Sequence, residues 1–271
     1  MSLLLHLSDT HFGCEDAPVV EALRRMAHEL RPDVVVLSGD ITQRARTAQF
    51  EAARAFCDSL EVPRLLTLPG NHDIPLYNLL ARIFDPYGGY KRVFGRDLEP
   101  VLDDEHLLVV CVNTTRATRH KDGVVSASQV NRVVERLHRA RREQLRVVVT
   151  HQPACVMREE DEKDRLHGGD VAVRSWSRAG ADLVLGGHIH LPYVTDLCAR
   201  VKGAPRAMYC LQAGTAVSLR VRHGSPNSVN VVRWQPAVPG EPRTCRVERW
   251  DYDLADGRFE CTHEHDLKLA D

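Results

Sequence analysis

Short apolar runs alternate with longer amphipathic segments over roughly the first 190 residues of the chain. The runs are rich in Val and Leu and are apolar throughout, which is typical of strands buried on both faces. Such strands are expected at 3–7, 33–37, 64–68, 106–113, 145–151 and 181–188. The amphipathic segments predict helices at 18–30, 47–60 and 126–141, the last with capping-box spacing between Ser126 and Gln129. This alternation indicates parallel strands joined by right-handed crossovers.

The pattern changes after about residue 190, where apolar and polar positions indicate consecutive strands joined by Gly/Pro turns. These are expected at 192–201, 206–214, 228–234, 244–253 and 258–267. Without a linker-like tract or a repeat, we expect one α/β domain over 1–271, built from two packed sheets flanked by helices. Its core blocks would span 3–215, and the C-terminal strands within 193–268 would complete a second, more antiparallel sheet.

Two stretches fit neither pattern, namely 74–105 and 155–170. Both follow strands that end in chemically active side chains. We expect long loops or short helices there, as is common for lids over sites.

Composition restricts the class of protein. The chain has 271 residues, of which 43% are hydrophobic and 27% charged, so it is globular and not disordered. Its net charge of -1 provides no overall field that would recruit nucleic acid or an anionic membrane. The apolar stretch at 3–7 is too short for a signal peptide or a membrane span. The eight cysteines are scattered without a C-x-x-C pair, which favours free thiols in a reducing cytoplasm.

Polar side chains follow five of the predicted strands within a few positions. Because the carboxyl ends of parallel strands lie side by side in an open sheet, we expect these side chains to converge. The five blocks are Ser8-Asp9-Thr10-His11, Ser38-Gly39-Asp40, Pro69-Gly70-Asn71-His72-Asp73, Thr150-His151-Gln152-Pro153 and Gly186-Gly187-His188-Ile189-His190.

The residue types in these blocks suit metal binding. Asp9 and His11, like His188 and His190, are i, i+2 pairs, which on an extended backbone point the same way and can grip one ion. Asp40 offers two carboxylate oxygens that can bridge two cations. Taken alone, each block has an ordinary interpretation, since Gly-Asp is a common turn and a lone histidine is more often part of a core. All five blocks in this order, each after a strand, favour a site.

The remaining donors complete a mixed nitrogen and oxygen set. Asn71 contributes an amide oxygen and His151 an imidazole nitrogen. Such a set suits Mn, Fe, Co or Zn better than Ca. Two such ions about 3.5–4 Å apart are a standard device for phosphoryl transfer, because they clamp the phosphoryl group and lower the pKa of a bound water.

The order of these motifs, from Asp-x-His through Gly-Asn-His-Asp to Gly-His-x-His, resembles that of the calcineurin-like metallophosphoesterases across residues 3 to about 215. The motifs "GNHDIP" and "GHIH" are most similar to those of the bacterial branch that contains the cyclic-nucleotide phosphodiesterases. The resemblance implies a four-layer α/β/β/α sandwich that hydrolyses small phosphodiesters, such as cyclic nucleotides, by means of a metal-activated hydroxide.

The resemblance also implies roles for individual residues. His72 would protonate the leaving oxygen, and Asp73 would orient His72. Thr150 departs from many relatives, which carry a second histidine or another polar residue there; this leaves the substrate open. One ion would be held by Asp9, His11, Asp40 and His190, and the other by Asp40, Asn71, His151 and His188.

Two further groups have both a functional and an ordinary interpretation. Asn113, Arg116 and His120, with Arg119 and Lys121, could hold a phosphate or a base, or could form a solvated charged loop. Aromatic residues between 77 and 94 could stack a nucleobase, or could pack a subdomain. They are Tyr77, Phe84, Tyr87, Tyr90 and Phe94.

Other functions of the same fold stay open at this point. A nuclease of the DNA-repair exonuclease type is disfavoured by the net charge and by the lack of an added DNA-binding domain. A scaffold like that of retromer is disfavoured because such proteins lose ligands or the acid histidine, whereas this chain retains them. Phosphomonoester hydrolysis and a homodimer are both compatible with the sequence.

Overall fold

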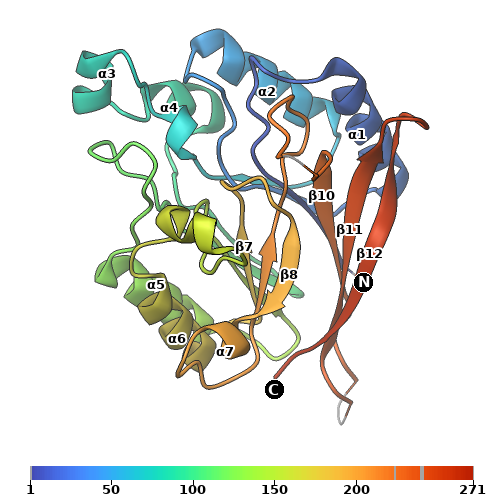
Figure 1. The fold of residues 1–271 in the computed structure, drawn as a ribbon. Helices are drawn as coiled ribbons and strands as arrows, with labels where there is room; N and C mark the ends of the chain where they lie inside the picture. The colour runs from blue at the N-terminus through green and yellow to red at the C-terminus, as the bar shows by residue number, and fades with distance from the viewer. Residues whose placement is uncertain (1, 223, 239–240, 271) are drawn as a thin grey trace.

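The computed structural model describes residues 2–222, 224–238 and 241–270. It contains two six-stranded sheets, each mixed in strand direction (Figure 1). The first has the order β12-β11-β10-β1-β2-β3, with β1 Ser2–Leu7, β2 Val34–Leu37, β3 Leu65–Thr67, β10 Ser228–Trp234, β11 Thr244–Asp253 and β12 Arg258–Lys268. The second has the order β4-β5-β6-β7-β9-β8, with β4 Val101–Asp103, β5 Leu107–Cys111, β6 Leu145–Val149, β7 Leu183–Gly186, β8 Tyr193–Asp196 and β9 Tyr209–Gln212.

Four layers follow from the side-chain alternation along the strands. On β1, Leu3, Leu5 and Leu7 pack beneath two helices, whereas Leu4 lies between the sheets. The helices on the first sheet are α1 Ala17–Leu30 and α2 Thr47–Ser59, and those on the second are α5 Ala127–Leu137 and α6 Gly169–Ala179. The predicted arrangement of two sheets flanked by helices is therefore confirmed, as is the capping box in which Ser126 Oγ accepts from the Gln129 N–H.

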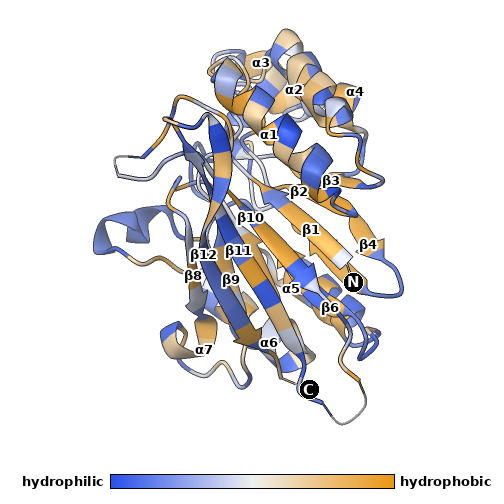
Figure 2. Ribbon diagram, turned by 90° about the vertical axis from the view of Figure 1, so that its right-hand side faces the viewer, coloured by the Kyte–Doolittle hydropathy of each residue, from blue (hydrophilic) through white to orange (hydrophobic). Residues whose placement is uncertain are grey.

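The hydropathy pattern distinguishes the interior strands from the edge. In Figure 2, β1 and β2 are mainly hydrophobic, whereas β12 at the sheet edge is mainly hydrophilic. A polar edge strand discourages pairing with other chains. Within the described residues, no helix is both long and apolar enough to cross a membrane.

The assignment of strands to sheets differs from the prediction. The strands within 193–268 were expected to complete the second sheet, but only β8 and β9 do so. Strands β10 to β12 instead extend the first sheet, because β10 pairs antiparallel with β1 from Ser2↔Trp234 onward. In the same way, β5 to β7 lie in the second sheet and not beside β1 to β3. The five polar blocks therefore come from two sheets.

The segments without a clear pattern contain short elements. Residues 74–105 include α3 Leu79–Phe84 and α4 Gly88–Phe94, and residues 155–170 include the 3-10 helix η2 Glu159–Asp164. A second short 3-10 helix, η1, covers Asn71–Asp73. The predicted strand at 192–201 is shorter than expected, because the Asp196 side chain accepts from the Cys198 N–H and begins α7 Leu197–Arg200. All eight cysteines are free.

Candidate metal centre

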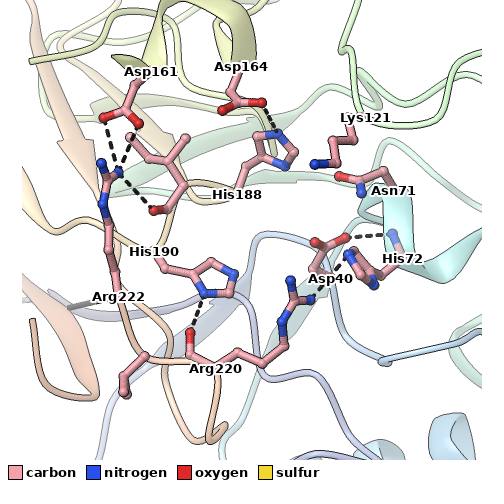
Figure 3. Close-up of a pocket in the computed structure, with 12 residues that line it drawn as sticks. Asp40, Asn71, His72, Lys121, Asp161, Asp164, His188, His190, Arg220 and Arg222 are labelled. Atoms are coloured by element: carbon pink, nitrogen blue, oxygen red, sulfur yellow. Dashed lines mark hydrogen bonds and ion pairs between the residues drawn. The ribbon is translucent and has the colours of Figure 1, made fainter. Parts of the chain in front are cut away.

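The five polar blocks meet where the carboxyl ends of parallel strands from both sheets face one another. Three blocks follow β1, β2 and β3, and two follow β6 and β7. A pocket of about 430 Å³ opens over them. Figure 3 shows its wall, to which the blocks contribute Asp40, Asn71, His72, His188 and His190.

The backbone is strained at this point. Among the described residues, eight non-glycine residues have positive φ, and five of these belong to the blocks: Asp9, His11, Asp40, His188 and His190, with φ from 43° to 74°. The argument from an extended backbone was therefore wrong, since these positions are left-handed. The consequence is visible at His188 and His190, whose donor atoms fall in two different clusters. Strain of this kind is concentrated at functional sites.

The first cluster contains Asp9, His11 and His190. His190 Nε2 lies 3.2 Å from Asp9 Oδ1 and 3.1 Å from His11 Nε2. The other side of each group is fixed: Asp9 Oδ2 accepts from the His188 backbone N–H at 2.8 Å, and His190 Nδ1 lies 2.6 Å from the Arg220 carbonyl oxygen. Asp9 Oδ1 and His190 Nε2 therefore face the centre of the cluster.

The second cluster contains Asp40, His151 and His188. His151 Nδ1 donates to the Ser38 carbonyl at 2.8 Å, which directs Nε2 to a position 3.3 Å from Asp40 Oδ1. Asn71, at the start of η1, directs its amide oxygen to the same pocket (Figure 3).

Asp40 lies between the two clusters. Its Oδ2 is 3.8 Å from His11 Nε2 in the first, and its Oδ1 is 3.3 Å from His151 Nε2 in the second. The His72 backbone N–H donates to Oδ1 at 2.8 Å and fixes the carboxylate. Burial alone would raise the pKa of Asp40, but the nearby His151 outweighs it and holds the pKa well below its usual range.

The residues present fit a pair of metal ions. Of the eleven buried side-chain polar atoms without a hydrogen-bond partner among the described residues, four lie at the clusters: Asp9 Oδ1, Asn71 Oδ1, His151 Nε2 and His188 Nδ1. Unsatisfied buried atoms are costly, so a cluster of them calls for a ligand. Burial lowers the pKa of both His11 and His188 to about 3, so these imidazoles are neutral at pH 7 and offer a lone pair. The donors are nitrogen and oxygen, which suits Mn, Fe, Co or Zn.

Two glycines let the strand ends approach so closely. Gly39 has φ +98°, and a Cβ there would lie 2.6 Å from His151 Nδ1. At Gly70 a Cβ would overlap the backbone nitrogen of Asp40. A side chain at either position would push the blocks apart.

His72 lies beside the ligand side chains but is held differently. Its Nδ1 is 3.0 Å from the Gln43 carbonyl oxygen, so Nδ1–H can donate there while Nε2 faces the pocket. The His11 ring meets it edge-on at 4.8 Å. Donor atoms of His11, Asp40 and His72 also lie close enough together to form a third candidate cluster.

Asp73 does not orient His72 as expected. Its carboxylate accepts backbone N–H groups from Ile41, Thr42 and Gly70 at 2.8–3.0 Å, and these contacts turn it away from the imidazole. The Gln43 carbonyl takes the orienting role instead. Burial raises the pKa of Asp73 to about 7. The nearby Asp40 carboxylate also raises this pKa, whereas the three backbone N–H groups lower it. Asp73 thus braces the turns that carry Asp40 and Asn71.

Sequence reasoning missed Arg220. Its Nη1 lies 3.2 Å from His72 Nε2 and 3.2 Å from Gln43 Oε1, directly over the clusters (Figure 3). Arg220 lies eight residues beyond the end of β9, farther than the few positions at which the five polar blocks follow their strands. The rule of polar side chains at strand ends therefore does not indicate it.

Two other basic residues line the pocket. Arg222 is paired with Asp161 of η2 at 3.0 Å, and its Nη1 also donates to the Ile189 carbonyl at 3.3 Å. This joins η2 to the block at 186–190. Lys121 directs its ammonium group into the pocket near Asn71 (Figure 3).

Of the predicted substrate-binding group, Lys121 lines the pocket, whereas Asn113, Arg116 and His120 lie elsewhere. Asn113 and Arg116 line a separate hollow, where Arg116 donates to the Asn113 carbonyl and to Gln129. His120 is exposed and is not among the residues that line the pocket. The aromatic group divides: Tyr90 is buried and packs on Phe94, Tyr87 donates to the Thr115 carbonyl, and Tyr77 and Phe84 are exposed.

Comparisons with known proteins agree with this geometry. A family model described as calcineurin-like phosphoesterase matches residues 3–192. Glycerophosphodiester phosphodiesterase GpdQ from Enterobacter lignolyticus (strain SCF1) is 39% identical over 84 residues, a match that covers 26% of this chain and only 29% of that relative.

Two solved structures share the fold. A purple acid phosphatase from yellow lupin seeds has a TM-score of 0.70 at 10% identity, covering 98% of this chain and 53% of that one. A dimetal phosphatase from Danio rerio has a TM-score of 0.65 at 11% identity, covering 99% of both chains. At such identities these likenesses show the architecture alone.

Proposed function

The chain belongs to the calcineurin-like phosphoesterase family, and we propose that it hydrolyses small phosphodiesters with the help of two metal ions. One observation carries this proposal: two clusters of donor atoms share the Asp40 carboxylate at the floor of an open pocket.

The donor side chains would divide between two ions according to the two clusters that they form. Ions held there would polarise the phosphoryl oxygens and lower the pKa of a water molecule that acts as the nucleophile. Ion one would take Asp9, His11, Asp40 and His190, and ion two would take Asp40, Asn71, His151 and His188. The identity of the metal, among Mn, Fe, Co and Zn, is part of the proposal.

His72 would supply a proton to the leaving oxygen. The Gln43 carbonyl accepts from Nδ1 and directs Nε2 to the pocket. An alkoxide leaving group needs a proton as its bond to phosphorus breaks, and a positioned acid contributes about 10²–10⁴-fold to the rate.

Arg220 would bind a non-bridging oxygen of the same phosphoryl group. Its guanidinium donates to Gln43 Oε1 at 3.2 Å, and this contact keeps it over the donor clusters. A guanidinium is permanently charged and forms strong hydrogen bonds to phosphate, and such bonds strengthen as charge develops in the transition state.

A small diester is the preferred substrate within this proposal. The pocket of about 430 Å³ is in the size range of small-ligand sites. A relative that matches part of the chain carries the name of a glycerophosphodiester phosphodiesterase. We therefore place cyclic nucleotides and glycerophosphodiesters first. A cytoplasmic location belongs to the same proposal, since all eight cysteines are free.

A substrate panel tests this function. The protein, stripped of metal and resupplied with Mn²⁺, is offered cyclic nucleotides, a glycerophosphodiester, a chromogenic diester, the matching monoester and single-stranded DNA. We expect hydrolysis of the small diesters to exceed that of the monoester. Turnover of the monoester alone, or of DNA alone, would contradict the proposal.

A further inference from the structure

Helix α3 presents a large apolar surface to solvent. None of its residues is buried, and five large apolar side chains within eight positions are 65% to 81% exposed. They are Tyr77, Leu79, Leu80, Ile83 and Phe84. In Figure 1, α3 projects from the molecule beside α4. We call these five side chains the α3 patch. Contiguous exposed apolar surface of this kind marks an interaction site.

Helix α3 is amphipathic, but its apolar face, instead of its polar face, points to solvent. At about 100° per residue, Leu79, Leu80, Ile83 and Phe84 share one face, which points to solvent. The opposite face carries Arg82, whose guanidinium donates to the Pro75 carbonyl at 3.1 Å and to the Arg119 carbonyl at 2.9 Å. A surface helix normally packs its apolar face inward. The protein therefore uses an arginine to hold the apolar face outward.

The helix is also fixed at its beginning. The Asn78 side chain accepts from the Ala81 N–H at 3.0 Å and caps the first turn. Together with the contacts of Arg82, this cap keeps the patch in one orientation. The patch is thus a presented surface and not a frayed segment.

Arginines surround a hollow next to the patch. The hollow has a volume of about 570 Å³ and is lined by Arg44, Arg46 and Arg92, together with Tyr77 from the patch. Its acidic lining residue, Asp85, is paired with Lys91 at 3.1 Å. Within the described part of the chain, no carboxylate lies within ion-pair distance of the three arginines. With three arginines and one carboxylate, the lining of the hollow carries a net positive charge.

We propose that the α3 patch and this arginine hollow dock onto an anionic lipid surface, with the apolar side chains in the acyl boundary and the arginines on the lipid phosphates. Exposed Leu, Ile, Phe and Tyr next to unpaired arginines is the chemistry of interfacial anchors. The overall charge of -1 predicts no such partner, but the local distribution of charge does.

A second copy of the chain fits this surface less well. In a two-fold dimer the same patch would meet itself, and the arginines of the two hollows would approach one another without carboxylates between them. An anionic surface removes that repulsion.

Docking through α3 would also place the metal centre near the lipid. Tyr77 follows His72 by five residues, and Arg82 holds the loop of Arg119, which leads to the pocket residue Lys121. The docking proposal does not depend on the proposed hydrolysis, because binding is measured on its own.

Co-sedimentation with vesicles tests the proposal. The full chain is mixed with vesicles of phosphatidylcholine alone or of phosphatidylcholine with phosphatidylglycerol, and the bound fraction is measured. We expect binding only to the anionic vesicles, with loss to background for the double variant Leu80→Asp, Ile83→Asp. The variants Arg46→Ala and Arg92→Ala should each weaken binding about fivefold.

The control variant is Leu254→Asp, to be compared with the single variant Leu80→Asp, because each introduces one negative charge; Leu254 is 85% exposed in the turn between β11 and β12. The Leu254 variant should bind as the unmodified chain does. Equal binding to neutral vesicles, no binding to either kind, or equal loss in the Leu254 variant would overturn the proposal. A dimer that the double variant dissolves, seen by sedimentation equilibrium, would assign the patch to a second copy instead. Circular dichroism and the melting temperature, unchanged in all variants, show that they are folded.

Discussion

Two donor side chains of the metal centre use one polar atom for structure and leave another free. His151 donates Nδ1–H to the Ser38 carbonyl, and Asp9 accepts the His188 N–H through Oδ2. Their opposite atoms, Nε2 and Oδ1, are buried without a hydrogen-bond partner among the described residues. Outer contacts of this kind orient metal ligands and tune their basicity. The centre is therefore preorganised for cations before they bind.

Asp40 should be the ligand whose loss is most damaging, because one carboxylate approaches both clusters. In the variant Asp40→Ala we expect fewer than two bound ions per chain and loss of nearly all hydrolysis. His190→Ala should retain more metal, since His190 belongs to one cluster. Elemental analysis of both variants, with Asp40→Asn as a variant of unchanged shape, measures this. Normal turnover with two ions in Asp40→Ala would disprove the bridging role.

His72 separates proton donation from metal binding. His72→Ala should keep both ions and lose about 10²–10⁴-fold in activity on a diester with an alkoxide leaving group. It should lose distinctly less on a nitrophenyl ester, whose leaving group is a far weaker base. The comparison is made at equal metal content. Equal losses on the two substrates would indicate a positioning role, and loss of an ion would make His72 a ligand.

Arg220 should contribute through the phosphoryl group. Removing a charged hydrogen bond costs about 1.5–3 kcal/mol, so Arg220→Ala should lower kcat/KM about 10- to 100-fold and weaken inhibition by inorganic phosphate. Arg220→Lys should recover part of the loss. Arg116→Ala is the control, because Arg116 lies in the separate hollow and should leave both quantities unchanged. A larger effect of the Arg116 substitution than of the Arg220 substitution would indicate that the loop at 113–121 binds the substrate instead.

At the level of elements, a buried ion pair joins the two sheets at the end away from the pocket. Arg243, just before β11, donates to both carboxylate oxygens of Asp182, just before β7, at 2.8 Å each. Both side chains are buried, and Arg243 also donates to the Gln144 carbonyl at 2.8 Å. The pair fixes one end of the sheet interface, and the metal centre lies at the other.

Breaking this pair should destabilise the fold without affecting the site. A buried charge left without any partner costs about 3–5 kcal/mol. In Arg243→Ala, Asp182 would keep Arg206 at 3.6 Å and the Arg146 backbone N–H at 3.0 Å, so the free energy of unfolding should fall by less than that amount. Metal content of the folded fraction should stay unchanged. The exposed pair of Arg246 with Asp266 is the control, and Arg246→Ala should have no measurable effect on denaturant unfolding. Similar stability of the two variants would show that the buried pair is not a tie between sheets.

The elements themselves were largely predictable from the sequence, but their partners were not. Buried Val and Leu runs indicate strands wherever they lie, so β1, β2, β5, β6 and β7 could be located. Which strand pairs with which depends on long-range packing, and the pairing of β10 with β1 has no local signal. The left-handed backbone at His188 and His190 was not predicted either, because non-glycine residues adopt this conformation only when the surrounding structure forces it. Arg220 was missed because it lies eight residues beyond the end of β9, where no local pattern marks it.

At the level of the whole molecule, the first and the second donor cluster are each shared between the two sheets. Asp9 and Asp40 follow strands of the first sheet, whereas His151 and His190 follow strands of the second. Ions bound there would tie the sheets together and favour the folded state. Chelation should therefore lower the melting temperature of the unmodified chain, and Mn²⁺ should restore it. A melting temperature that changes neither on chelation nor on addition of Mn²⁺ would show that no ion bridges the sheets.

The most direct test is a metal titration of the stripped protein, in which bound Mn²⁺ and hydrolysis of a chromogenic diester are followed together. The two clusters and the shared Asp40 predict no turnover without metal and full turnover only as the bound ions approach two per chain. Asp40→Asn should fail to reach that activity at any Mn²⁺ concentration. Turnover by the metal-free protein, or full activity with only about one ion per chain, would contradict the two-metal centre.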